Sequence, residues 1–179
     1  MRRVLCILAL VAVAALPAAA QGPKAEVFGG YSYVRVNPGG GDNGINLNGW
    51  NASVTGNLND WFGITADFGG SYGSPNVGGT QVDTNAHTFL FGPRIKARGD
   101  KVEPFAHALF GAARVEGSAL GISISDSGFG MALGGGLDWK ANDAISIRLG
   151  QFDYLMTRIG GDNQNNFRFS TGIVFRFGR

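Results

Sequence analysis

A strict alternation of bulky apolar residues with small or polar residues is the feature that most constrains the fold of this chain. Eight segments of about 10 to 13 residues show this period of two, and the chain after residue 21 lacks the roughly 3.6-residue period of an amphipathic helix. The segments are residues 25–36, 45–56, 61–72, 86–96, 102–114, 128–138, 144–156 and 166–177. The pattern therefore predicts an all-β fold of eight strands.

Residue size indicates which face of each strand looks inward. In residues 128–138, Phe129, Met131 and Leu133 alternate with glycine and alanine. A soluble barrel points its apolar face inward and covers its outside with long charged side chains. Small side chains instead suit the crowded lumen of an eight-stranded barrel, and large apolar ones suit contact with lipid. The sequence therefore predicts an antiparallel, up-and-down transmembrane β-barrel.

The connections between the segments alternate in length. Short gaps at 57–60, 97–101 and 139–143 are rich in Asn, Asp and Gly, which is typical of tight turns. The longer gaps are residues 37–44, 73–85, 115–127 and 157–165. Barrels of this kind have short periplasmic turns and longer outer loops. With an even number of strands, we expect both termini in the periplasm and four long loops outside a bacterial outer membrane.

The N-terminus has the three parts of a secretory signal peptide. Arg2 and Arg3 supply the basic region, residues 4–16 are apolar, and residues 18–20 are alanines. The apolar stretch is shorter than the roughly 20 residues that a membrane-spanning helix needs. We therefore expect a cleaved signal peptide at 1–20 and an outer-membrane β-barrel domain at 21–179.

Composition agrees with a membrane barrel and argues against nucleic acid as a partner. The chain has 30 glycines and 13 phenylalanines, and only 16% of its residues are charged. The chain has 15 basic and 13 acidic residues. Loss of Arg2 and Arg3 with the signal peptide would leave equal numbers of each. A chain without net charge or a basic run is not expected to bind nucleic acid.

The chain resembles the small OmpA-like outer-membrane β-barrel proteins of bacteria over residues 25–177. The resemblance is carried by the order and spacing of EVFGGYSYVRV, NDWFGITADFGG, HTFLFGPRI, PFAHALFGAARV, ALGGGLDW, IRLGQFDYLMTR and NFRFSTGIVFRF. It implies insertion by the outer-membrane assembly machinery, which reads a last strand that ends in an aromatic residue. Phe177 matches that residue, although Gly178 and Arg179 follow it. The peptidoglycan-binding domain of larger relatives is not expected here.

Six charged residues have the parity of the inward face. They are Asp67, Arg94, Asp138, Arg148, Arg168 and Arg176. An arginine facing lipid at the membrane midplane costs about 2–4 kcal/mol, so we expect these side chains to form an ion-pair network in the lumen. Glu26 and Glu103 are candidates to join it from the periplasmic end. A narrow ion path through the network is the alternative interpretation.

Inward parity remains open in two segments. Residues 104–113 are apolar or small on both faces and can be read either way. In 144–156, Arg148 and Asp153 have opposite parity, so a β-bulge near Gly150 is required if both point inward.

Aromatic residues gather near both ends of the predicted strands. Tyrosine and tryptophan favour the boundaries of a membrane. The predicted girdles are Tyr31, Tyr33, Tyr72 and Tyr154 at the outer end, and Trp61, Trp139 and Phe177 at the periplasmic end.

No catalytic residue, cofactor or metal site is predicted. Some eight-stranded outer-membrane barrels modify lipid A, but His87 and His107 do not match the His-x-Ser pair of the deacylases. Two isolated histidines also lack metal-ligand spacing. We expect a monomeric protein with a structural or surface-interaction role and a plugged, polar lumen. Its expected partners are outer-membrane lipid, lipopolysaccharide and the assembly machinery. A narrow low-conductance pore and a lipid A-modifying enzyme are the alternatives.

Overall fold

The structure, a computed structural model, describes residues 22–36, 44–74, 76–77, 80–81, 83–119, 122–159 and 162–178. The predicted signal peptide at 1–20 lies outside the described residues. The strands are β1 Ala25–Val36, β2 Ile45–Asn57, β3 Phe62–Gly73, β4 Asn76–Val77, β5 Thr80–Gln81, β6 Asp83–Lys96, β7 Val102–Ala119, β8 Ile122–Lys140, β9 Ile145–Ile159 and β10 Asp162–Phe177.

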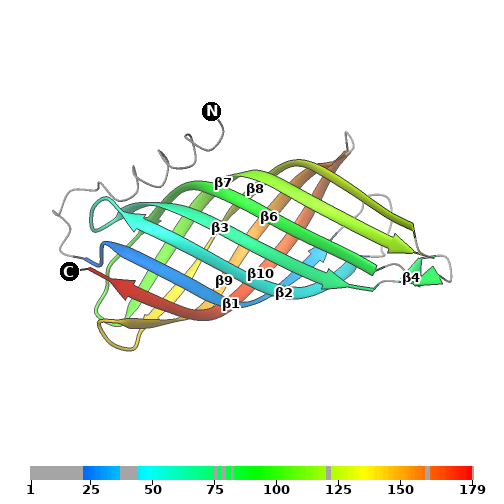
Figure 1. The fold of residues 1–179 in the computed structure, drawn as a ribbon. Coiled ribbons are helices and arrows are strands. Elements are labelled where there is room, and N and C mark those ends of the chain that lie inside the picture. The colour runs from blue at the N-terminus through cyan, green and yellow to red at the C-terminus, as the bar shows by residue number, and fades with distance from the viewer. Residues whose placement is uncertain are drawn as a thin grey trace.

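Eight of these strands form a closed antiparallel barrel in the order β1-β10-β9-β8-β7-β6-β3-β2 (Figure 1). The remaining two, β4 and β5, pair only with each other in the connection between β3 and β6. The ring closes where β1 meets β10, from Ala25 opposite Phe177 to Arg35 opposite Phe167. Closure satisfies the backbone groups of a sheet that would otherwise be exposed to lipid. The predicted eight-stranded up-and-down barrel is confirmed.

Asparagine side chains shape two of the three short turns. The Asn59 side-chain oxygen accepts hydrogen bonds from the backbone N–H groups of Trp61 and Phe62, at 3.0 and 2.7 Å. The Asn142 side-chain oxygen accepts from those of Ala144 and Ile145, at 2.9 and 2.8 Å. These local bonds replace ladder bonds where the chain reverses. The sequence prediction of tight turns here is confirmed.

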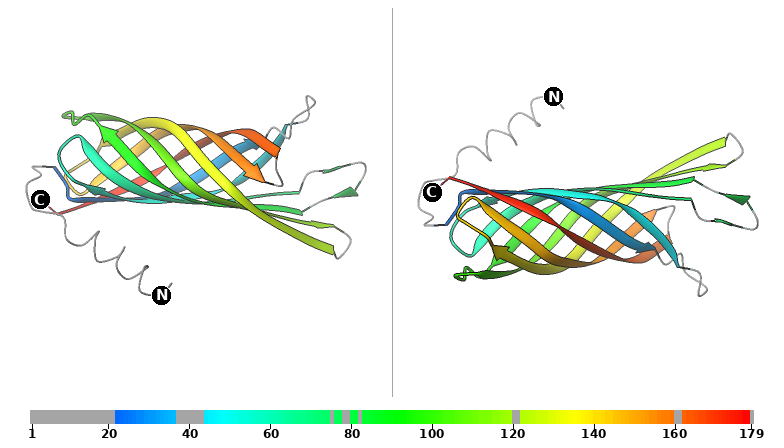
Figure 2. Two further views of the ribbon diagram at one scale, coloured as in Figure 1. Left: turned by 90° about the horizontal axis from the view of Figure 1, so that it is seen from above. Right: turned by 90° about the horizontal axis from the view of Figure 1, so that it is seen from below.

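The β7–β8 hairpin is longer than the sequence prediction. Its strand pairing continues to Ala119, which lies opposite Ile122. The prediction of a long loop at 115–127 is therefore wrong. Hairpin pairing satisfies backbone N–H and C=O groups whatever the side chains are, so both strands can continue past the residues whose alternation predicted them. Figure 2 shows this hairpin projecting past the ends of β9 and β10.

Two further long connections also contain strand structure. In the predicted loop 157–165, β9 runs to Ile159, which pairs with Asp162 at the start of β10. Within the predicted loop 73–85 lies the β4–β5 pair, and β6 has already begun at Asp83. Most of the fourth predicted loop, residues 37–43, lies outside the described residues.

The barrel is apolar outside and holds its charges inside. Leu133 and Ile173 are 43% and 47% exposed, whereas Asp67 and Arg148 are buried in the lumen. A water-soluble barrel would show the reverse arrangement. Among the described residues, no helix is long and apolar enough to cross a membrane.

A β-bulge in β9 places both of its lumen charges inside. Arg148 pairs with Asp138 and Gly150 pairs with Leu137, so Leu149 is an extra residue on the β9 side of this ladder. The extra residue reverses the parity, and both Arg148 and Asp153 are buried. The structure thus contains the bulge that the sequence required for this arrangement.

Candidate functional site

The side chains that fill the lumen form the candidate site. All six predicted lumen residues, Asp67, Arg94, Asp138, Arg148, Arg168 and Arg176, have buried side chains inside the barrel. They divide into two connected clusters, one near the turn end and one near the middle of the barrel.

Asp138 on β8 organises the turn-end cluster. Its carboxylate lies 3.1 Å from Arg94 Nη2, 2.9 Å from Lys96 Nζ and 2.9 Å from Arg148 Nε. The three cations come from β6 and β9, and Asp138 is 0% exposed. One carboxylate therefore holds three positive charges together in a site that water does not reach.

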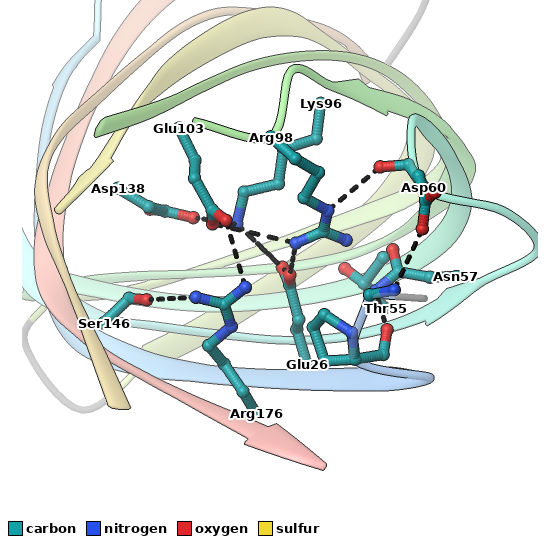
Figure 3. A network of polar contacts seen from close by, with 12 residues as sticks. Glu26, Thr55, Asn57, Asp60, Lys96, Arg98, Glu103, Asp138, Ser146 and Arg176 are labelled. Carbon is teal, nitrogen blue, oxygen red and sulfur yellow. Dashed lines mark hydrogen bonds and ion pairs between the residues drawn. The ribbon is translucent and has the colours of Figure 1, made fainter. Parts of the chain in front are cut away.

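Glu26 and Glu103 complete this cluster at the mouth of the barrel (Figure 3). Glu26 lies 3.2 Å from Lys96 Nζ and 2.6 Å from Arg98 Nη1. Glu103 lies 2.9 Å from Lys96 Nζ and 3.0 Å from Arg176 Nη2. Arg98 comes from the β6–β7 turn and reaches across the mouth, where its Nε also donates to a backbone oxygen of the β2–β3 turn. The two candidate glutamates thus lie within the network.

Arg168 on β10 holds the central cluster together. It lies 2.8 Å from an oxygen of Asp67 and 2.8 Å from one of Asp153. The His107 ring is 2.8 Å from the other Asp153 oxygen. Gln151 donates to Asp153 at 2.8 Å and accepts from Arg148 at 2.6 Å, so its side chain joins the two clusters.

A glycine makes room for the central cluster. A Cβ atom added at Gly134 would collide with the Asp153 carboxylate and with the backbone of β9. The glycine-rich part of β8 is therefore part of the site, because it allows the Asp153 side chain to lie flat across the neighbouring strand.

Two inward phenylalanines cover the guanidinium groups. Arg148 Cζ lies 4.1 Å from the centre of the Phe28 ring and 4.4 Å from that of Phe105, and Arg94 Cζ lies 4.2 Å from the Phe105 ring. Aromatic faces attract such cations, more strongly when both are desolvated. The two rings therefore cover faces of the guanidinium groups that do not contact a carboxylate, and they keep water away from those faces.

A cluster of apolar residues lines the lumen along four neighbouring strands. Leu90, Leu109, Ala132 and Leu155 pack together from β6, β7, β8 and β9, all buried. The lumen, which the sequence predicted to be plugged and polar, thus also contains an apolar cluster. The sequence did not reveal it because the segment 104–113 has apolar residues on both faces. The structure places the odd-numbered Phe105, His107 and Leu109 inside.

The lumen charges largely satisfy one another. Within the described chain, five buried carboxylates, those of Glu26, Asp67, Glu103, Asp138 and Asp153, each lie at ion-pair distance from at least one cation. Buried ion pairs of this kind are costly to break, because removing one partner leaves an uncompensated charge. The network can hold the barrel in one register, and its groups are engaged with each other.

Comparison with known proteins agrees with this inverted barrel. Residues 6–177 match the model of a family described as the outer membrane protein beta-barrel domain. The chain belongs to this family. Its membership supports an outer-membrane location. A comparison with curated proteins finds no match.

Solved outer-membrane barrels share the fold. Ail, the attachment invasion locus protein of Yersinia pestis, has a TM-score of 0.65 at 19% identity, over 88% of this chain and 100% of that one. Neisserial surface protein A has a TM-score of 0.67 at 11% identity, over 86% and 97%. The N-terminal β-barrel domain of Pseudomonas aeruginosa OprF has 0.57 at 12%, over 88% and 100%. Likeness at such low identity supports the fold alone.

The predicted girdle residues of this outer-membrane barrel lie on its outer surface. Tyr31, Tyr72, Tyr154, Trp61, Trp139 and Phe177 are exposed, and Tyr33 is half-buried. Hydrogen bonds join the tyrosine hydroxyls to neighbours: Trp50 Nε1 donates to Tyr72 at 3.3 Å, and Tyr154 donates to Asn165 at 2.7 Å. Trp50, which the sequence analysis did not assign to a girdle, lies beside the tyrosines at the loop end.

Both histidines of this outer-membrane barrel have structural partners. His87 faces outward, with Nε2 3.3 Å from the Tyr72 hydroxyl. His107 faces inward and contacts Asp153. Within the described ranges, no group of three His, Cys, Asp or Glu side chains is arranged to hold a metal ion.

Sequence reasoning missed two basic residues of the network. Lys96 has the same parity as Arg94, two residues earlier on β6, and this signal could have identified it. Arg98 lies in a turn, where alternation says nothing about direction.

Proposed function

We propose that this protein is an outer-membrane barrel with a structural or surface-interaction role and a plugged lumen. The observation that carries the proposal is the filling of the interior by paired charges, together with the buried apolar cluster of Leu90, Leu109, Ala132 and Leu155. The apolar cluster opposes ion passage because its side chains offer an ion no polar partner in place of water. Engaged charges oppose it because an ion would have to displace an existing partner.

Electrical recording tests the plug. The purified folded protein, identified by heat-modifiable gel migration, should show no stable conductance in planar bilayers. Reproducible single-channel openings of the folded protein would favour the narrow low-conductance pore instead. Loss or gain of lipid A acyl chains in expressing cells would favour the enzyme. Support for a non-catalytic role comes from the partners of the two histidines: among the described contacts, His87 binds Tyr72 and His107 binds Asp153, and neither binds a Ser, Thr or Cys side chain.

We propose that both termini and the short turns face the periplasm and that the long β7–β8 hairpin lies outside the cell. The contrast between tight turns at one end and projecting strands at the other supports this orientation. We also propose a cleaved signal peptide at 1–20, which would remove Cys6, the chain's only cysteine.

Cysteine labelling tests orientation and cleavage together. Ser127→Cys and Asp143→Cys place thiols at exposed positions toward opposite ends of the barrel. A membrane-impermeant maleimide should label Ser127→Cys on intact cells, and Asp143→Cys only after the outer membrane is permeabilised. The mass of the labelled proteins should correspond to residues 21–179 plus one label. The reverse labelling pattern would contradict the orientation, and a mass that includes residues 1–20 would contradict cleavage.

The proposed partners are outer-membrane lipid and lipopolysaccharide, with the assembly machinery during insertion. The exposed apolar wall and the surface tyrosines, such as Tyr31 and Tyr154, support contact with lipid and its headgroups. Phe177, exposed at the end of β10, supports recognition by the machinery. Among the structural neighbours, Ail has been solved in complex with the heparin analogue sucrose octasulfate. For this chain we propose a monomer.

A further inference from the structure

The projecting β7–β8 hairpin has one paired edge and one free edge. β8 pairs with β7 along its whole length, from Ile122 to Trp139. Its pairing with β9 begins only at Phe129, which lies opposite Arg158. Within the described chain, no strand pairs with residues 122–127 on the β9 side, and Figure 2 shows this part of the hairpin projecting past β9. We call residues 122–127 the β8 edge.

The register shows which backbone groups of β8 point to the free side. The N–H group of Lys140, at the end of β8, donates to the backbone oxygen of Lys101 on the β7 side at 2.8 Å. The β7–β8 register has no shift along its length. Because the N–H groups of alternate residues in a strand point to the same side, the even-numbered residues of β8 bond to β7. The odd-numbered Ser123, Ser125 and Ser127 therefore direct their N–H and C=O groups to the free side.

An aspartate closes the membrane-proximal end of the β8 edge. The Ser127 N–H group donates to the Asp126 carboxylate at 2.7 Å, which agrees with its pointing away from β7. Proline, lysine, a β-bulge or a covering element usually protects a strand edge from other chains. The segment ISISDSG at 122–128 has no proline or lysine. In the part of the chain that the structure describes, the edge groups of Ser123 and Ser125 have no such protection.

A strand edge selects its partner by the partner's backbone. Its alternating N–H and C=O groups are complementary to another extended chain, and six residues span about 20 Å. An added strand would continue the β8–β9 ladder beyond the point where β9 turns back, between Ile159 and Asp162. A second copy in the same membrane does not fit, because its β8 runs in the same direction. Two-fold pairing of one strand edge with itself is antiparallel.

We propose that the β8 edge binds an extended segment of another protein by strand addition. The main-chain groups of Ser123 and Ser125 supply the hydrogen bonds, and Asp126 limits the site toward the membrane. This inference rests on the surface-interaction role and the outward orientation proposed above, and it specifies the kind of partner. The two can fail separately, because the Ser127→Cys labelling tests orientation, whereas a peptide reaches both faces of a lipid nanodisc.

Amide hydrogen exchange of the protein in nanodiscs, followed by NMR, tests the proposal. The probe is a capped peptide with the sequence of residues 113–119, ARVEGSA, which already pairs with β8 on its other edge. In the free protein, the amides of Ser123 and Ser125 should exchange much faster than those of Ile124 and Asp126. At about ten times its Kd, the peptide should slow exchange at the two serines about tenfold and leave the other two amides unchanged.

Three results of this experiment would overturn the proposal. The first is an absence of slowing at millimolar peptide. The second is equal slowing at odd- and even-numbered residues, which would indicate general rigidification of the hairpin. The third is slowing that depends on protein concentration without peptide, which would assign the β8 edge to a second copy of this chain.

A backbone substitution at Ser125 removes a donor from the edge. Ser125→Pro deletes an N–H group that points to the free side, so it should spare the ladder with β7 and lower the peptide affinity about three- to tenfold. Ser125→Ala is the matched control. It removes the hydroxyl, which lies 3.4 Å from Arg114 Nη2, and keeps the backbone donor, so the affinity should stay unchanged. Wild-type affinity in a folded Ser125→Pro variant would contradict strand addition at this edge.

Release of the Ser127 N–H group gives an independent readout if Ser125→Pro does not fold. Asp126→Ala removes the carboxylate that binds this group and adds one free donor to the edge. The peptide affinity should therefore rise about two- to tenfold. Asp126→Asn keeps an acceptor oxygen at the same place and should bind the peptide like the wild type. Unchanged or weaker binding in Asp126→Ala would count against the assigned edge.

Discussion

Replacing Asp138 with asparagine should lower the free energy of unfolding by about 3–5 kcal/mol. The substitution keeps the shape of the side chain and removes its charge. Arg94, Lys96 and Arg148 would then lose their shared carboxylate, and like charges would remain together in a site that is 0% exposed at Asp138. Urea-induced unfolding and refolding in lipid vesicles, followed by tryptophan fluorescence, measures the change.

The matched control for this variant is Asp143→Asn in the β8–β9 turn. Asp143 lies 3.0 Å from Lys140, but its side chain is 62% exposed. Exposed ion pairs contribute about 0–1 kcal/mol, so this variant should unfold near the wild-type urea concentration. Similar small losses for both variants would mean that the Asp138 cluster does not stabilise the barrel.

Placing arginine at Leu133 should destabilise the barrel by about 2–4 kcal/mol, the usual cost of this residue on the lipid side near the membrane midplane. Leu133 points outward from β8, midway between Phe129 and Trp139. Its surroundings in the bilayer offer no water and no carboxylate. The same unfolding measurement in lipid gives the size of the effect.

A second arginine variant shows whether membrane depth is the cause. Val102 also points outward, but it lies at the start of β7 opposite Trp139. Near the interface an arginine costs about 0–1 kcal/mol, because its side chain reaches the headgroups. Equal effects of Leu133→Arg and Val102→Arg would contradict a lipid-facing position for Leu133.

Alternation of residue size was sufficient to predict the barrel. In segments such as 128–138, glycine and alanine occupy one face, and Phe129 and Leu133 occupy the other. In a membrane barrel the bulky face must point to lipid and the small face must point to the lumen. The same parity placed Asp67 and Arg168 inside. Alternation could not predict the partner of each charge, because partners such as Asp67 and Arg168 lie 2.8 Å apart on strands distant in sequence.

Three features of the structure could not be predicted from alternation alone. The direction of Leu109 could not be predicted, because residues 104–113 are apolar or small on both faces. Leu90 shares the parity of Arg94, but alternation does not show that Leu90, Leu109 and Leu155 pack together. The projecting β7–β8 hairpin depends on backbone pairing that continues past Ala113 and Arg114, where the sequence prediction ended the strand. A turn residue such as Arg98 has no periodic neighbours at all, and its place across the mouth comes from three-dimensional proximity to Glu26.

The seam between β1 and β10 also governs the order of events during assembly. Ala25 lies opposite Phe177, so the ring cannot close until its last strand is available. Contacts between residues so far apart along the chain form slowly, since a long segment must first be brought round. Until that moment, the edges of β1 and the growing sheet remain open to other chains. The exported polypeptide is therefore most vulnerable to aggregation between the arrival of its first strand and that of its last, and a shorter interval should raise the yield of folded barrel.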